Sequence, residues 1–85
     1  MSMNAADTRR RVIKQIVGRA GIEAAAFDSI ADASIYEILD SLDVVQLLAA
    51  VETEFGTRLD PNSFPWESQP TIAQLAELLT GLVLR

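Results

Sequence analysis

The fold of this chain depends on residues 40–56, which read DSLDVVQLLAAVETEFG. At about 100° per residue, its large apolar side chains gather within about 60° of Val44, as one buried stripe of an amphipathic helix requires. The members of this stripe are Val44, Leu47, Leu48, Val51 and Phe55. Residues 40–56 therefore predict a helix that packs on a core, with Gly56 as its C-terminal cap.

A second apolar group lies on the same predicted helix, away from the buried stripe. Leu42, Val45 and Ala49 fall roughly 100 to 160° from the centre of the stripe, beside Gln46. A one-domain chain has little core left to cover a second apolar face. We therefore expect Leu42, Val45 and Ala49 to be exposed and to contact a partner protein.

The start of this helix is polar. Asp40 or Ser41 can cap its free backbone N–H groups, and Asp43 adds a carboxylate in the first turn, where the helix dipole favours negative charge. A phosphate ester on Ser41 is favoured for the same reason. The alternative is that residues 40–43 are only an N-cap in front of a core helix.

Residues 40–56 resemble the central segment of acyl carrier proteins. The family's pattern is matched by Asp-Ser-Leu-Asp at residues 40–43, followed by Val45, Leu47, Glu52, Glu54, Phe55 and Gly56. The resemblance extends to a long loop before this segment, and to a short helix and a final helix after it. It implies an all-α, acyl-carrier-type bundle of three main helices plus one short helix, with a long loop between helices 1 and 2.

The resemblance also implies a function and its partners. A phosphopantetheinyl transferase, holding a divalent metal and approached by Asp40, attaches 4'-phosphopantetheine from coenzyme A to Ser41. The thiol of the arm then holds an acyl or aminoacyl group as a thioester. A loading ligase supplies this group, and downstream transferase or condensing enzymes use it. The carrier itself catalyses nothing and has no metal site. The expected contact face comprises Asp40, Leu42, Asp43, Val45, Gln46, Ala49 and Glu52, whose polar members steer basic partners.

The cargo stays open between fatty-acid, polyketide, non-ribosomal peptide and aminoacyl pathways. Fatty-acid carriers usually place glutamate where this chain has Gln46, whereas residues 45–48 and 66–70 are similar to D-alanyl and other stand-alone aminoacyl or peptidyl carriers. Those families place a glycine shortly before the Asp-Ser pair, where this chain has Ile38-Leu39. The competing class is a carrier-like helical interaction module without the prosthetic group.

Composition agrees with a single small helical domain spanning residues 1–85. The 85 residues are 49% hydrophobic and 6% aromatic, which suits an aliphatic helical core. The chain has no cysteine and no histidine, which excludes disulfides, thiolate metal sites, histidine metal sites and Ser-His-Asp catalysis.

Charge and hydropathy indicate the kind of partner and the compartment. Five basic residues against Asp7 give residues 1–20 a local net charge of +4, and eleven acids against Arg58 give residues 21–84 a net charge of −10. Nucleic acid is repelled by most of such a surface. No apolar run reaches membrane-spanning length and the N-terminus lacks the hydrophobic core of a signal peptide, so we expect a cytoplasmic protein. We also expect it to be a monomer.

The remaining elements follow from caps and breaks in periodicity. After a loose start over residues 1–6, Asp7 or Thr8 caps a first helix to about Gly18 or Ala20, whose arginine cluster we interpret as a solvated face. Residues 21–39 predict a long, partly ordered loop. The apolar side chains expected to hold this loop on the bundle are Phe27, Ile30, Ile35, Tyr36 and Ile38.

The C-terminal third predicts one short helix and one long helix. Residues 62–68 suit a short third helix, which Pro65 limits to roughly one turn. Phe64 and Trp66 are expected in the core or over its edge. Thr71 and Gln74 have the spacing of a capping box at the start of the last helix. The buried stripe of that helix is expected to comprise Ile72, Leu75, Ala76, Leu79, and Leu82 or Val83.

Overall fold

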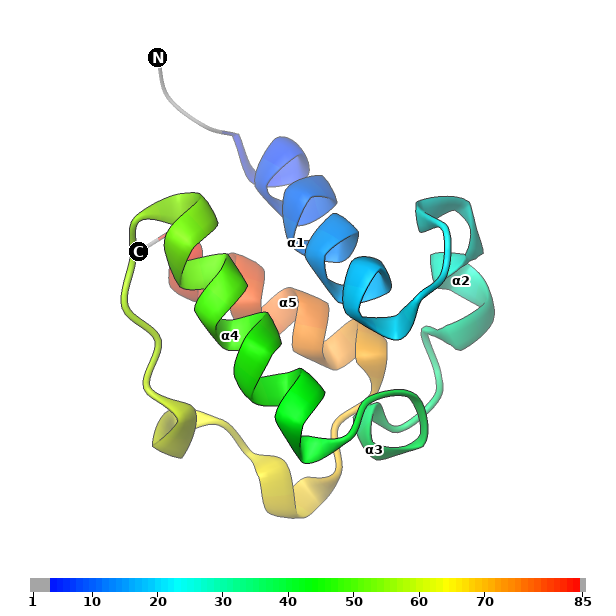
Figure 1. The fold of residues 1–85 in the computed structure, drawn as a ribbon. Helices are drawn as coiled ribbons and strands as arrows, with labels where there is room; N and C mark the ends of the chain where they lie inside the picture. Colours follow the sequence, from blue (N-terminus) through cyan, green and yellow to red (C-terminus); the bar gives the residue numbers. More distant parts are fainter. Residues whose placement is uncertain (1–3, 85) are drawn as a thin grey trace.

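The structure, a computed structural model, describes residues 4–84, which form a helical bundle (Figure 1). Its three long helices are α1 (Ala5–Ala20), α4 (Ser41–Phe55) and α5 (Ile72–Val83). Residues 4–84 contain no β-strand, and their one isolated β-bridge joins Ser34 to Thr71. The predicted all-α bundle of the acyl carrier type is confirmed.

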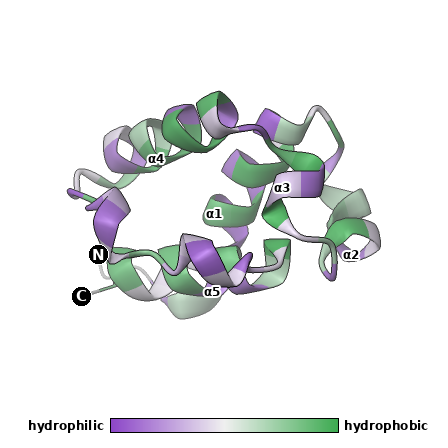
Figure 2. Ribbon diagram, turned by 90° about the horizontal axis from the view of Figure 1, so that it is seen from below, coloured by the Kyte–Doolittle hydropathy of each residue, from purple (hydrophilic) through white to green (hydrophobic). Residues whose placement is uncertain are grey.

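The core lies where the apolar stripes of the three long helices meet. α1 packs against both α4 and α5, and Figure 2 shows it between them, with hydrophobic residues along all three helices. The side chains with no exposed surface on these helices are Val12, Ile16, Leu47, Val51, Ile72, Leu75, Ala76 and Leu79, together with the polar Thr8. Val44 and Leu48 are also buried, whereas Phe55 is partly buried at the end of its helix. The stripes predicted for α4 and α5 are therefore confirmed, with partial burial at their ends.

The first helix begins earlier than expected. Asn4 caps α1, because its side-chain oxygen accepts a hydrogen bond of 2.8 Å from the Asp7 backbone N–H. The expectation that Asp7 or Thr8 is the cap is wrong. Thr8 lies inside the helix, where its hydroxyl donates to the Asn4 carbonyl oxygen at 3.0 Å. Ala5 and Ala6 therefore belong to α1, and residues 1–3 of the expected loose start lie outside the described residues.

The long connection between α1 and α4 is more regular than expected. It contains the 3₁₀-helix η1 (Ala24–Ala26) and two single-turn helices, α2 (Phe27–Ile30) and α3 (Ile35–Ile38). Backbone hydrogen bonds of 2.9 to 3.0 Å join this connection to the start of α5. The Ile35 N–H donates to the Pro70 carbonyl oxygen, the Ile72 N–H to that of Ala33, and the Ala73 N–H to that of Ala31. The last two bonds use helix N-terminal donors that have no intrahelical partner.

Apolar side chains also hold this connection on the bundle, although not all of the expected ones. Phe27 and Ile35 are buried, and Ile30 and Ile38 pack against the core from its edge. Tyr36 is 47% exposed, so its expected burial is wrong. Its hydroxyl instead donates a 3.4 Å hydrogen bond to the Trp66 carbonyl oxygen, which keeps the polar end of the ring outside the core.

The segment between α4 and α5 returns the chain along the outside of the bundle (Figure 1). The short third helix predicted there is replaced by two 3₁₀ turns, η2 (Pro61–Ser63) and η3 (Trp66–Ser68). Phe64 separates them in an extended conformation that the following Pro65 favours. Phe64 is buried, and Trp66 packs edge-on against it with ring centroids 4.9 Å apart. The predicted capping box of Thr71 and Gln74 then opens α5.

Two glycines provide a matched test of the helix ends. Gly56 ends α4 with φ +62°, a left-handed conformation that costs an L side chain about 1 kcal/mol. Gly81 lies within α5, and a Cβ there meets nothing within 4 Å. We expect Gly56→Ala to lower the free energy of unfolding by about 1 kcal/mol and Gly81→Ala to raise it by ~0.5–1 kcal/mol. Urea unfolding measures both, and equal signs for the two variants would contradict this assignment of helix ends.

Candidate functional site

The start of α4 presents Ser41 as its first helical residue. Asp40 is the cap, because its Oδ1 accepts a 2.7 Å hydrogen bond from the Asp43 backbone N–H. The Asp43 carboxylate accepts one of 3.3 Å from the Asp40 N–H in return. Of the two caps that the sequence allows, the structure uses Asp40. The Ser41 hydroxyl is therefore not consumed by capping.

Ser41 differs from the other described serines in leaving its hydroxyl unused. Ser29, Ser63 and Ser68 donate their hydroxyls to backbone carbonyl oxygens, and Ser34 accepts a bond from a backbone N–H. Within residues 4–84, the exposed Ser41 side chain has no hydrogen-bond partner. A hydroxyl in this state needs to break no internal contact before it reacts with another molecule.

Leu42, Val45 and Ala49 lie on the outer side of α4, as predicted. Leu42 is 62% exposed and Val45 is 61% exposed, although both are large apolar side chains, and Ala49 is exposed as well. The predicted exposure of this second apolar group is confirmed, and its contact with a partner stays a prediction.

The polar residues predicted around this group have partners of their own within the chain. The Gln46 Oε1 accepts a 3.0 Å hydrogen bond from Arg19 Nη1 on α1. The Glu52 Oε2 accepts one of 2.9 Å from the Leu59 backbone N–H, which fixes the segment that follows α4. Asp43 is partly buried and serves in the cap. Arg19 was not among the predicted site residues, because its contact with Gln46 joins positions that lie far apart in the sequence.

The arginines of α1 join helices and do not form only a solvated face. Arg9 pairs with Glu77 of α5 at 2.6 Å, and Arg11 pairs with Glu54 of α4. The Arg11 guanidinium also lies 4.5 Å from the centre of the Phe55 ring. Each exposed pair contributes little alone, about 0–1 kcal/mol. Arg9 and Arg11 therefore remain partly exposed, as expected of a solvated face, and they also link α1 to both neighbouring helices.

Two other kinds of site are absent from residues 4–84. No helix in this range is both long and apolar enough to cross a membrane. The same range holds no group of three or more acidic side chains arranged to bind a metal ion. Asp40 and Asp43 bond to each other's backbone N–H instead.

Comparison with known proteins identifies the family of the chain. A family model described as PP-binding, phosphopantetheine attachment site, matches residues 10–79, which include all of α4 and most of α1 and α5. Neither the curated proteins nor the solved structures gave a match. The prediction of a phosphopantetheine-binding carrier is therefore confirmed at the level of the family. The chain belongs to the phosphopantetheine attachment site family and is a carrier protein whose covalently attached cofactor is 4'-phosphopantetheine.

Proposed function

We propose that Ser41 is the attachment point of phosphopantetheine and that the chain presents a thioester-bound acyl or aminoacyl group to biosynthetic enzymes. The observation that carries this proposal is the free, exposed hydroxyl of Ser41 at the first position of α4. It is supported by the family match, which extends well beyond both sides of this residue.

The surroundings of Ser41 fit a phosphodiester. Within residues 4–84, the backbone N–H groups of Ser41 and Leu42 have no hydrogen-bond partner, because the cap uses only the N–H of Asp43 and the Asp40 carbonyl accepts from Val44. Free N–H groups and the positive end of the helix dipole favour an anion at this position. Leu42, the next side chain, is mostly exposed and leaves this end of the helix open to a transferase.

The chain supplies a nucleophile and a position for it. The Ser41 oxygen attacks the pyrophosphate of coenzyme A at the phosphorus that bears the pantetheine arm, and the new O–P bond replaces the bond to the departing adenosine 3',5'-bisphosphate. The transferase supplies the base that takes the hydroxyl proton, since the chain has no histidine and its neighbouring carboxylates are engaged in the cap. When bound, the arm supplies a thiol whose thioester is reactive enough to be passed on. The α4 helix keeps the attachment point at one end of the bundle, away from the core.

The outer side of α4 is proposed as the surface that partner enzymes contact. Leu42, Val45 and Ala49 provide the apolar part, and Asp40 and Asp43 provide negative charge beside Ser41. A small apolar patch with a charged rim suits partners that bind in turn and release quickly. We propose the transferase, a loading ligase and downstream transferase or condensing enzymes as these partners, and the cytoplasm, where coenzyme A is available, as the compartment. The protein is proposed to act as a monomer.

Intact-mass measurement tests the proposal. The chain is incubated with coenzyme A and a broad-specificity phosphopantetheinyl transferase, and one phosphopantetheine is expected to be added to each chain. A fully unchanged mass would defeat the attachment proposal for this chain. It would favour the competing class, a carrier-like helical interaction module without the prosthetic group.

A charge on the proposed contact surface tests the role of α4. Val45→Arg is expected to slow loading by a partner enzyme about tenfold, because it places a charge in an apolar contact. Its helical circular dichroism should match that of the unsubstituted chain, since Val45 is 61% exposed. Leu84→Arg is the control, because Leu84 is a 43% exposed apolar residue at the far end of α5. Unfolding of Val45→Arg, or equal slowing by Leu84→Arg, would show that this surface is assigned wrongly.

A further inference from the structure

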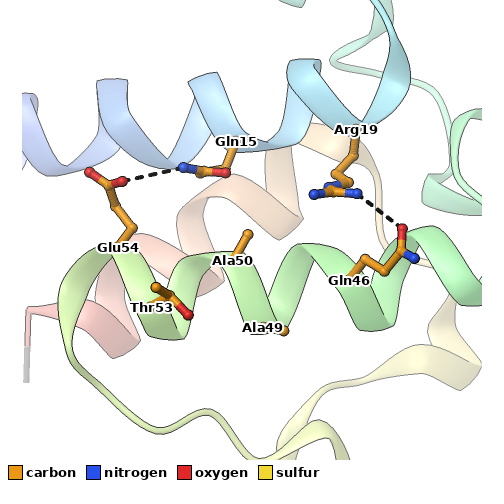
Figure 3. Close-up of a pocket in the computed structure, with 7 residues that line it drawn as sticks. All are labelled: Gln15, Arg19, Gln46, Ala49, Ala50, Thr53 and Glu54. Atoms are coloured by element: carbon orange, nitrogen blue, oxygen red, sulfur yellow. Dashed lines mark hydrogen bonds between the residues drawn. The ribbon is translucent and has the colours of Figure 1, made fainter.

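An open groove of about 690 Å³ runs between α1 and α4 (Figure 3). Arg19 and Gln46 lie at one end of it, and Gln15 and Glu54 lie at the other. Only small side chains lie between the two ends: Ala49, Ala50 and Thr53, all from α4. The groove is therefore polar at its ends and offers room for another molecule's side chain in its middle.

The two ends of this α1–α4 groove differ in charge. The Glu54 carboxylate pairs with Arg11 and lies 3.5 Å from the Gln15 side-chain nitrogen, so its charge is compensated. Arg19 forms no ion pair within residues 4–84, whereas Arg9, Arg10 and Arg11 of the same helix each have a carboxylate partner. The Arg19 end therefore carries a positive charge that no carboxylate of the described chain neutralises.

The hydrogen-bond chemistry at the Arg19 end is also one-sided. A guanidinium group can only donate, so Gln46 must present its oxygen to Arg19, which it does at 3.0 Å. The amide nitrogen of Gln46 then lies on the side of the amide away from Arg19, as Figure 3 shows. Arg19 uses one nitrogen in this bond and keeps further N–H groups for another acceptor. Arg19 therefore offers N–H donors beyond the one bonded to Gln46, and a carboxylate is the acceptor that a guanidinium group binds most strongly.

We propose that the α1–α4 groove receives an acidic segment of a partner enzyme, with an Asp or Glu carboxylate on Arg19 and a neighbouring apolar side chain over Ala49 and Ala50. This inference rests on the proposed function, because Gln46 and Ala49 also belong to the surface expected to contact partners. The small side chains of Ala49 and Ala50 leave room for an apolar side chain, which a protein segment can supply and a free carboxylate cannot. With Asp40 and Asp43 at the start of α4, the partner meets negative charge beside Ser41 and positive charge at Arg19. Opposite charges at these two places let α4 bind a partner in one orientation along the helix and disfavour the reversed orientation.

The probe for this inference is a helical peptide of about 15 residues, rich in alanine and leucine, with glutamates along one edge. A second peptide has lysines in place of the glutamates. Each is added to the isotope-labelled chain, and the backbone amide signals of Ala49, Ala50 and Thr53 are followed by NMR. The glutamate peptide is expected to move these signals at concentrations where the lysine peptide does not. Arg19→Gln is expected to weaken its binding about three- to fivefold, because it removes the cation.

Two further variants separate the Arg19 site from general charge. Gln46→Glu is expected to weaken the binding of the glutamate peptide as much as Arg19→Gln does. The reason is that the new carboxylate pairs with Arg19 within the chain. Lys14→Gln removes one charge from the same helix, but Lys14 lines a different hollow, with Ala24, Ala25 and Phe27. Its effect is expected to stay within about twofold, as for a surface charge outside the contact.

Several outcomes would overturn the inference. They are the absence of shifts with the glutamate peptide, equal binding of the lysine peptide, and equal weakening by Lys14→Gln. Sodium acetate producing the same shifts at the same carboxylate concentration would make the groove a site for free carboxylates instead of a protein segment. The mass gain after treatment with the transferase is measured independently of peptide binding. A chain that gains phosphopantetheine but ignores the glutamate peptide refutes only the groove proposal, and a chain without mass gain refutes the proposed function.

Discussion

The Ser41→Ala chain is expected to gain no phosphopantetheine while folding as the unsubstituted chain does. The substitution removes the nucleophilic oxygen, and the neighbouring Asp40 and Asp43 carboxylates are engaged in the cap. We expect the addition of phosphopantetheine to be lost completely, because no other side chain in residues 40–43 carries a hydroxyl group. The stability change is expected to stay within about 0.5 kcal/mol, because Ser41 is exposed and Asp40 caps the helix. Intact mass after treatment with transferase, together with urea unfolding, measures both effects.

The matched controls are two other exposed serines. Ser63 and Ser68 donate their hydroxyls to the carbonyl oxygens of Asp60 and Pro65 within 3₁₀ turns. Ser63→Ala and Ser68→Ala are expected to gain one phosphopantetheine, as the unsubstituted chain does. A Ser41→Ala chain that still gains the group, or a Ser63→Ala chain that does not, contradicts the assignment of the attachment point.

Leu47→Ala is expected to lower the free energy of unfolding by about 3 kcal/mol. Leu47 has no exposed surface and lies in the middle of the α4 stripe, so truncation leaves a cavity that the surrounding side chains fill only in part. Small domains have total stabilities of about 5–15 kcal/mol, so this is a large share of what holds the bundle together. A clear shift of the urea midpoint, with the slope unchanged, is the expected result.

Val45→Ala is the control for that prediction. It removes two methyl groups from the same helix, but Val45 is 61% exposed. We expect its effect to stay within about 0.5 kcal/mol, partly because alanine favours the helix more than valine does. Similar losses for Leu47→Ala and Val45→Ala would mean that the core and outer sides of α4 have been confused.

Regular helices were predictable from this sequence because their signals are local. The stripes of α4 and α5 follow a period that a long helix must obey, and the Thr71–Gln74 capping box is contained within four residues. The start of α1 was missed because Asn4, Asp7 and Thr8 are all able to cap a helix. Choosing among them depends on where the helix packs, which short-range patterns do not contain.

The connections were less predictable because tertiary contacts determine them. The segment from Gly21 to Leu39 is ordered partly by backbone bonds to the start of α5, which lies more than 30 residues later. Tyr36 looked like a core residue by its size, but its hydroxyl finds the Trp66 carbonyl outside the core. Over residues 62–68, one short helix was expected, but the structure has two 3₁₀ turns separated by the buried Phe64 and by Pro65.

The candidate site divides in the same way. Ser41, the apolar outer group of α4 and the charged start of the helix were all predicted from residues 40–56 and their resemblance to carriers. The choice of Asp40 over Ser41 as the cap, which frees the Ser41 hydroxyl, emerged only from the structure. So did the contact between Arg19 and Gln46, because no periodicity links two side chains 27 positions apart.

The most direct test of the central claim, that Ser41 at the start of α4 is the attachment point, is to locate the added group. The transferase-treated chain is digested, and the modified peptide is fragmented by tandem mass spectrometry. We expect phosphopantetheine on Ser41 and on no other residue. Attachment to another serine or threonine, with Ser41 unmodified, would contradict it.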